Sequence, residues 1–191
     1  MSRIPVYFVL LSVLLPLGVA QAVGAGSTIT FGSGAARECF LGANLARLSA
    51  ESAMPACNQA LTQQKLTRME RASTLVNRGI LLTHRRNFDS ALADFNEALE
   101  LIPGFAEAYL NRGNAYLFVG QFDQAVSDYG AAIKGETRKP HAAYYNRGLA
   151  REAMRQPKRA YRDFRRAADL RPAWALAVDR VEHYAGKGYG K

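Results

Sequence analysis

A four-residue pattern recurs three times in this chain of 191 residues, and it restricts the possible folds more than any other feature. Each copy is a bulky residue followed by Asn-Arg-Gly, and the glycines Gly79, Gly113 and Gly148 are 34 and then 35 residues apart. An alanine follows each glycine after 12 residues, an aromatic residue after 16 and a second alanine after 19. A period of this length indicates a repeated supersecondary unit, because one such unit buries its apolar face only by stacking on its neighbours.

The residues between these markers favour helices. From Arg37 onwards the chain is rich in Ala, Leu, Arg and Glu and has few β-branched runs. Pro103 and Pro172 stand where the second helix of a unit should end, because proline cannot continue the helical hydrogen-bond ladder. Thr137 takes this place in the middle unit. The pattern predicts three helix-turn-helix units, at residues 72–105, 106–140 and 141–174.

The order of glycine, alanine, aromatic residue, alanine and proline resembles the tetratricopeptide repeat (TPR), and the chain resembles the small exported TPR proteins of Gram-negative bacteria. The resemblance implies an all-α TPR superhelix of antiparallel helix pairs. Glycine such as Gly79 would then face alanine such as Ala91 at a close helix crossing, and the aromatic residues would fill the space between units. The resemblance also implies a non-enzymatic scaffold that binds a peptide or protein segment in its concave groove.

The two ends of the array are expected to be atypical. Residues 175–185 are predicted to form a capping helix, followed by a flexible tail at residues 186–191. Residues 37–71 are predicted to form a degenerate helical hairpin, with helices at 37–48 and 53–63 and an insertion at 62–71.

Cys39 and Cys57 are the two cysteines of the chain, and each lies on one helix of the predicted hairpin. An even number of cysteines in an exported chain favours a disulfide. Two free buried thiols and half of a metal site are the alternatives. A metal site would need further ligands, but His84, His141 and His183 are far apart in the sequence.

The first 22 residues have the three parts of a secretory signal peptide: a positive charge at Arg3, an apolar run at residues 6–15 and small residues near Ala22. We expect cleavage after Ala22 or Ala25, and the alternative is a retained N-terminal anchor. No cysteine stands at the cleavage position, so a lipoprotein is not expected. The sequence therefore predicts a periplasmic or secreted protein, with a Gly/Ser/Ala-rich flexible leader at residues 23–36.

The asparagine of each repeated motif is the main candidate for ligand binding. The resemblance to TPR proteins implies that this position faces the concave groove. An amide side chain there can both donate hydrogen bonds to a peptide backbone and accept them from it. The alternative is that these amides bond locally within the protein. The full set of predicted groove residues is Asn77, Asn111, Asn114, Asn146, Phe118 and Tyr145.

The arginine of each motif is expected to be structural. An aspartate follows each arginine after 16 residues, on the second helix of the same unit. Bidentate pairs of this kind suit the guanidinium group. The alternative is that the three arginines form a row that binds carboxylate groups of a partner. The predicted pairs are Arg78 with Asp94, Arg112 with Asp128 and Arg147 with Asp163.

The charge of the chain is concentrated in the last unit. The formal net charge is +9 and the isoelectric point is about 9.8, and residues 138–171 hold eleven basic against three acidic residues. This imbalance suggests docking on an acidic protein, an acidic polymer or a lipid surface, with at most peripheral membrane association. Nucleic acid is not expected as a partner of an exported chain. The predicted basic patch is Arg151, Arg155, Lys158, Arg159, Arg162, Arg165 and Arg166.

Catalytic motifs are absent from the sequence. There is no G-x-S-x-G, no H-E-x-x-H and no phosphate-binding loop, so no enzyme activity, cofactor or metal is expected.

Overall fold

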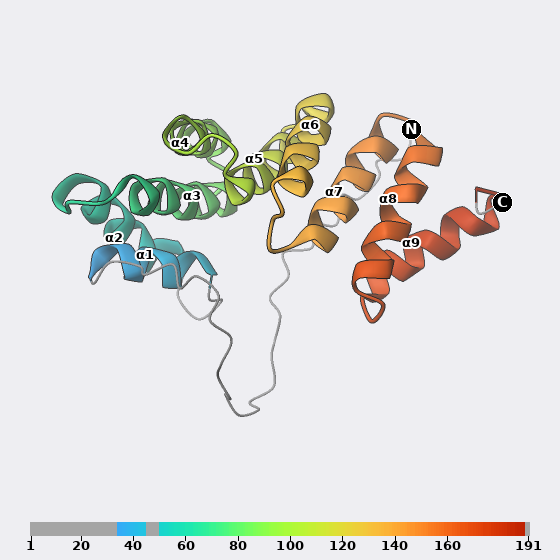
Figure 1. Ribbon diagram of the computed structural model, residues 1–191, viewed down its shortest axis with the longest axis horizontal. Helices are drawn as coiled ribbons and strands as arrows, with labels where there is room; N and C mark the ends of the chain where they lie inside the picture. Colours follow the sequence, from blue (N-terminus) through green and yellow to red (C-terminus); the bar gives the residue numbers. More distant parts are fainter. Residues whose placement is uncertain (1–33, 45–49, 190–191) are drawn as a thin grey trace. The chain divides into compact units, whose positions relative to one another are not determined.

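The structure is a computed structural model that describes residues 34–44 and 50–189 (Figure 1). The predicted signal peptide lies outside these residues. Every regular element within them is an α-helix, and none of these helices is both long and apolar enough to cross a membrane. The helices are α1 Ala35–Asn44, α2 Ala50–Gln63, α3 Arg68–His84, α4 Phe88–Leu101, α5 Ala106–Phe118, α6 Phe122–Lys134, α7 Pro140–Ala153, α8 Pro157–Leu170 and α9 Ala175–Gly186.

The helices pack as consecutive pairs, which confirms the predicted all-α architecture. Helix α1 packs on α2, α3 on α4, α5 on α6 and α7 on α8, while α9 covers α8 (Figure 1). The first helices of successive pairs also contact one another, from α1 through α3 and α5 to α7. They form an inner layer, and the second helices α2, α4, α6 and α8 form an outer one.

The start of α3 corrects one predicted boundary. Thr67 caps this helix: its side chain accepts a hydrogen bond from the backbone of Glu70, whose carboxylate accepts one from the Thr67 backbone. This capping box begins the helix at Arg68. The predicted long connection at residues 62–71 is therefore wrong, because α2 runs to Gln63 and only residues 64–67 connect the helices. The additional residues of this unit lengthen α3 instead, which has 17 residues against 13 in α5.

The first described helix corrects a second boundary. Helix α1 begins at Ala35, so the predicted leader at residues 23–36 extends too far into the folded part. Ala35 and Ala36 are buried against Ala56 and Ala60 of α2, and this apolar contact orders them. The predicted helix at residues 37–48 is described only as far as Asn44.

Each regular unit is held together by an aromatic ring that lies on a glycine. Phe95, Tyr129 and Phe164 are fully buried. The side chain nearest to each glycine is this ring. A Cβ atom on the glycine would lie 2.6 Å from the ring for Gly79 and Phe95, 2.9 Å for Gly113 and Tyr129, and 2.7 Å for Gly148 and Phe164.

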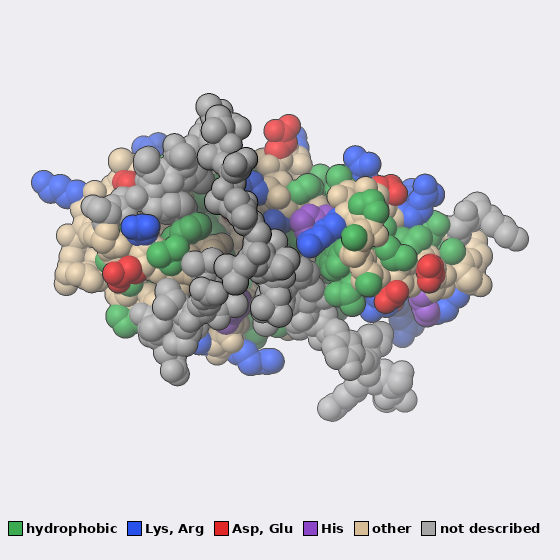
Figure 2. Space-filling view, turned by 90° about the horizontal axis from the view of Figure 1, so that it is seen from below, with side chains coloured by type: hydrophobic (Ala, Val, Ile, Leu, Met, Phe, Trp, Pro, Cys, Tyr) green, Lys and Arg blue, Asp and Glu red, His purple; other side chains and the backbone are tan. Residues whose placement is uncertain are grey.

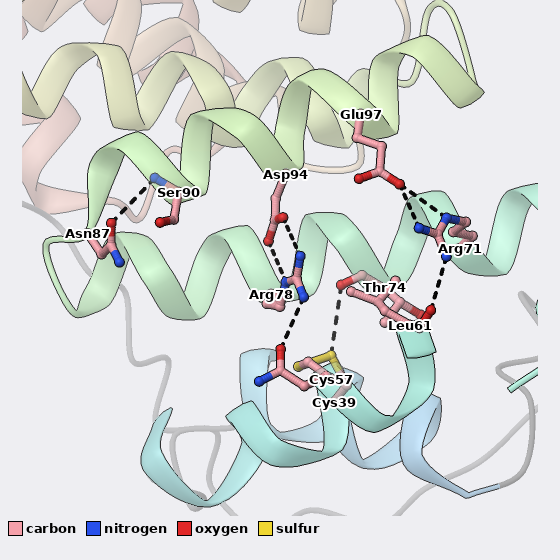
Figure 3. A network of polar contacts seen from close by, with 11 residues as sticks. Cys39, Cys57, Leu61, Arg71, Thr74, Arg78, Asn87, Ser90, Asp94 and Glu97 are labelled. Atoms are coloured by element: carbon pink, nitrogen blue, oxygen red, sulfur yellow. Dashed lines mark hydrogen bonds and ion pairs between the residues drawn. A yellow bond between two sulfur atoms is a disulfide. The ribbon is translucent and has the colours of Figure 1, made fainter. Parts of the chain in front are cut away.

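The hairpin of α1 and α2 replaces this ring contact with a disulfide. Cys57 stands where the other units have the aromatic residue, and it is bonded to Cys39 with a Cα–Cα distance of 4.7 Å. Both sulfur atoms are buried, and the Cys39 Sγ lies 3.9 Å from the carbonyl oxygen of Thr74 in α3 (Figure 3). The cystine therefore ties α1 to α2 and packs this hairpin against α3.

Two alanine substitutions at helical glycines should have opposite effects. Gly79→Ala would drive a methyl group into the fully buried Phe95 ring, and we expect the free energy of unfolding to fall by about 1–3 kcal/mol. Gly130→Ala in α6 meets no atom closer than the Arg147 Nη1 at 3.9 Å, so the better helix former should raise it by about 0.5–1 kcal/mol. Urea denaturation of both variants measures the difference, and equal effects would contradict the ring-on-glycine contact.

Loss of the disulfide should destabilise the N-terminal hairpin first. The bridge joins residues 18 positions apart, and a loop of about this length contributes about 3 kcal/mol in the chain-entropy model. We expect the Cys39→Ala/Cys57→Ala variant to melt at a lower temperature, with faster amide exchange in α1 and α2 before α8. Unchanged melting would show that the packing alone holds this hairpin.

Candidate protein-interaction site

The three predicted Arg–Asp pairs are present, and each joins the two helices of one unit. In every pair, the arginine Nε and Nη2 donate to the two carboxylate oxygens of the aspartate. The Nε and Nη2 distances are 2.8 and 2.7 Å from Arg78 to Asp94, 2.7 and 2.8 Å from Arg112 to Asp128, and 3.0 and 2.8 Å from Arg147 to Asp163. The aspartates are buried, and their hydrogen bonds raise the pKa of Arg78 and of Arg112.

A third bond extends two of these pairs to the preceding unit. Arg78 Nη1 donates to Asn58 Oδ1 of α2 at 3.1 Å, and Arg112 Nη1 donates to Asn96 Oδ1 of α4 at 2.7 Å. For Arg147, the equivalent of Asn58 and Asn96 in the preceding unit is Gly130, which has no side chain to accept a hydrogen bond. Asn58 and Asn96 directly follow Cys57 and Phe95, which occupy the same position in successive units. The recurrence of asparagine after this position is the sequence pattern from which these bonds could have been predicted.

Asn77 does not have the role predicted for it. It is 6% exposed, because α1 packs on this face of α3, and Asn44 of α1 donates to its Oδ1 at 3.3 Å. The local alternative therefore holds for Asn77: its amide connects the N-terminal hairpin to the first regular unit. Asn44 was not among the predicted site residues.

Asn111 is a motif asparagine whose acceptor is not used by a described residue. It is half-buried on α5, and its Nδ2 donates to the Glu107 carbonyl one turn earlier at 2.8 Å. Among the hydrogen bonds of the described residues, its Oδ1 accepts none. The amide is thus held in place by its own helix while its oxygen is left for another donor.

Asn114 and Asn146 form a cluster with a buried phenol. The Tyr129 hydroxyl donates to Asn114 Oδ1 at 2.9 Å, and Asn146 Nδ2 donates to the same oxygen at 2.9 Å. Burial raises the pKa of Tyr129 well above its usual range, so the hydroxyl stays protonated and can donate. Asn114 is therefore structural, whereas no described residue donates to Asn146 Oδ1.

The aromatic residues predicted for the groove are packed within the protein. Tyr145 is 3% exposed and its ring lies 4.7 Å from the Trp174 ring, so its prediction as a ligand-binding residue is wrong. Phe118 is half-buried and stacks on Phe88 of α4 with ring centroids 5.3 Å apart. A pocket for a partner's side chain would need the face of the Phe118 ring, and this face is in contact with Phe88.

The predicted basic patch remains exposed except at its first member. Arg151 Nη1 donates to Asp163 Oδ2 at 2.7 Å, so Arg151 shares this carboxylate with Arg147 and is not a free surface cation. The other six lie on the exposed side of α8 or in the turn before it: Arg155, Lys158, Arg159, Arg162, Arg165 and Arg166.

Two segments of this helical array match known repeat families. Residues 95–127 and residues 141–173 each match a family model described as tetratricopeptide repeat. The chain therefore contains two tetratricopeptide repeats, and it shares the fold of solved TPR domains. The fold is thus an all-α TPR solenoid, a fold consistent with protein–protein interaction.

Sequence relatives of this chain share only part of their length with it. Human tetratricopeptide repeat protein 36 is 30% identical over 105 residues, which cover 53% of this chain and 56% of that protein. Protein bimA of Emericella nidulans is 30% identical over 100 residues, which cover 52% of this chain and 12% of that protein. The chain therefore spans about half or less of the curated relatives named here.

Solved TPR structures are similar over a larger part of the chain. The Arabidopsis OM64 TPR domain has a TM-score of 0.60 at 29% identity and covers 63% of this chain and 99% of that one. The first TPR of Spaghetti (RPAP3), bound to the HSP90 peptide SRMEEVD, has a TM-score of 0.58 at 24% identity, covering 62% and 94%. MamA from Desulfovibrio magneticus RS-1 has a TM-score of 0.66 at 21% identity, covering 83% and 87%. The last two likenesses show the fold alone.

A double substitution should test whether Asn114 has a structural role as the acceptor for Tyr129. Asn114→Leu leaves the buried Tyr129 hydroxyl without this acceptor, and we expect a loss of about 1–3 kcal/mol of unfolding free energy. The other units pair phenylalanine with an aliphatic residue at these positions, as Phe95 with Ile80. Asn114→Leu/Tyr129→Phe should therefore recover most of the loss in urea denaturation. A double variant that is no more stable than Asn114→Leu would refute this pairing.

Proposed function

We propose that this protein is a non-enzymatic interaction scaffold that binds an extended peptide segment along the inner faces of α5 and α7. The observation that carries the proposal is the half-buried Asn111, whose Nδ2 is held by its own helix while its Oδ1 accepts no bond from a described residue. The RPAP3 TPR, which shares this fold, is bound to a peptide.

The proposed binding site is limited to the middle of the array. Asn77 is excluded from it because α1 packs on α3, and the residues that remain are Asn111 and Asn146 on adjacent inner helices. Their free Oδ1 atoms are suited to accept from backbone N–H groups of a bound segment. Such bonds do not depend on the side chains of the segment. The site would therefore recognise the backbone of a segment in extended conformation.

The motif arginines do not provide a binding site for an acidic ligand. The motif arginines Arg78, Arg112 and Arg147 donate to their own aspartates and are not available to a ligand. We therefore propose that an acidic side chain or terminal carboxylate is not required in the segment bound here. Binding at this site should accordingly respond weakly to salt.

We further propose that the chain is exported and acts in the periplasm or at the cell envelope. The signal-peptide pattern of residues 1–22 supports this, and so does the Cys39–Cys57 disulfide, because such bonds persist in oxidising compartments. The enzyme alternative has no support from a catalytic motif in the sequence.

Peptide binding can be tested with segments selected from a random peptide display library on the full chain. The affinity of a selected peptide is then measured by calorimetry for the protein and for Asn111→Ala/Asn146→Ala. Each lost hydrogen bond is worth about 0.5–1.5 kcal/mol, so the double variant should bind about tenfold more weakly or worse.

The matched control is Gln124→Ala/Ser127→Ala, which removes two exposed polar side chains from the outer helix α6. It should bind as the unchanged protein does. If the Asn111→Ala/Asn146→Ala variant keeps full affinity while its circular dichroism and melting are unchanged, the inner-face site is refuted.

A further inference from the structure

A row of cations runs along the exposed side of α8. The side chains of Arg155, Arg159, Arg162 and Arg166 follow one another at helical spacings of four, three and four residues, and Lys158 and Arg165 flank them. All six are exposed, and none of them forms an ion pair with a described residue. The part of the row that lies on α8, from Lys158 to Arg166, is about 12 Å long at 1.5 Å per residue, and Arg155 lies in the turn before the helix.

The repeat fold does not require these cations. The same six positions of the first unit are Arg86, Asp89, Ser90, Ala93, Asn96 and Glu97. In the middle unit they are Gly120, Asp123, Gln124, Ser127, Gly130 and Ala131. Apart from Arg86 in the turn before α4, the first two units thus build equivalent hairpins with neutral and acidic residues there. Five like charges on one helix, with Arg155 in the turn before it, repel each other, so α8 carries an electrostatic cost that α4 and α6 avoid.

Arg151 extends the excess of positive charge onto α7. The other units have Leu82 and Tyr116 at this position, so the guanidinium is specific to the last unit. Arg151 shares the single carboxylate of Asp163 with Arg147, and its buried Nε has no hydrogen-bond partner. Burial lowers the pKa of Arg151, and repulsion from Arg147 and Arg159 adds to the effect. The cluster is therefore short of anionic acceptors.

Two exposed leucines lie at the C-terminal end of the row. Leu170 is the last residue of α8 and is 40% exposed, and Leu176 in the first turn of α9 is 38% exposed. Figure 2 shows the molecule from below, with apolar side chains at the end that carries α8 and α9 in Figure 1 and both basic and acidic side chains beside them. Cationic and apolar groups thus adjoin at one end of the array.

We propose that the α8 surface docks the protein on an anionic phospholipid bilayer. Guanidinium groups bind phosphate oxygens in a bidentate manner, and five of the six exposed cations are arginines. A straight row contacts several headgroups of a planar surface at once. Leu170 and Leu176 would enter the boundary between headgroups and acyl chains, a contact that a soluble acidic polymer does not offer.

The docking is peripheral. The apolar side of α8 is already used in the core, since Ala160, Phe164 and Ala167 are fully buried. The helix therefore stays folded on its repeat and does not insert. This inference is independent of the proposed peptide site, because it uses an outer helix and side chains that no inner-face contact involves.

The test is sedimentation of the full chain with phosphatidylcholine vesicles that contain or lack phosphatidylglycerol. Each cation near an anionic bilayer contributes about fivefold to partitioning. Arg155→Gln/Arg159→Gln/Arg162→Gln/Arg166→Gln should therefore lower the partition coefficient by more than about a hundredfold. Binding of the unchanged protein should weaken as salt is raised. Binding to the vesicles without phosphatidylglycerol gives the apolar baseline, to which the segment at residues 6–15 and the two leucines both contribute.

The matched control removes four exposed cations that are not on α8: Arg37→Gln/Arg68→Gln/Arg85→Gln/Lys134→Gln. It should keep most of the binding, although its net charge equals that of the α8 variant. Leu170→Ser/Leu176→Ser should reduce the binding that persists at high salt. Equal losses in both quadruple variants would overturn the proposal, and so would binding to polyglutamate without binding to the anionic vesicles.

Discussion

The contact between an aromatic ring and a glycine determines how closely the two helices of each unit approach. Because Gly79 has no Cβ, the Phe95 ring lies directly on the helix backbone. The same ring belongs to a buried cluster that includes Ala108 and Ala115 of the next unit. One side chain therefore holds a hairpin together and joins it to its neighbour, and the stacking of the array depends on it.

The Arg–Asp pairs link the two helices of each unit by hydrogen bonds, and they also determine which charges remain on the surface for partners. Each motif arginine satisfies a buried carboxylate, so the positive charge of the inner helices is neutralised inside the scaffold. The inner face is left with amides such as Asn111, while five exposed cations without an ion pair to a described residue gather on α8. The protein thus separates a surface suited to backbone recognition from a cationic surface suited to phosphate.

The residues that were predicted correctly are those whose role depends on spacing within one unit. Arg78 and Asp94 are 16 residues apart, a separation that the helix hairpin itself brings together. Asn77 and Tyr145 were predicted wrongly because their burial depends on contacts between units. Helix α1 covers Asn77, and Trp174 in the turn before α9 covers Tyr145. Neither neighbour belongs to the repeat period, so the period could not indicate them.

The sequence by itself determined the repeat, the helical class and the residues that close each hairpin, because a period of 34 residues fixes which side chains meet within a unit. Only the tertiary structure decided which of the recurring asparagines stay open. That outcome depends on the elements at the two ends of the array, which pack on the repeats without sharing their pattern. Identical motifs therefore acquire different roles: Asn77 is structural, whereas Asn111 keeps a free acceptor.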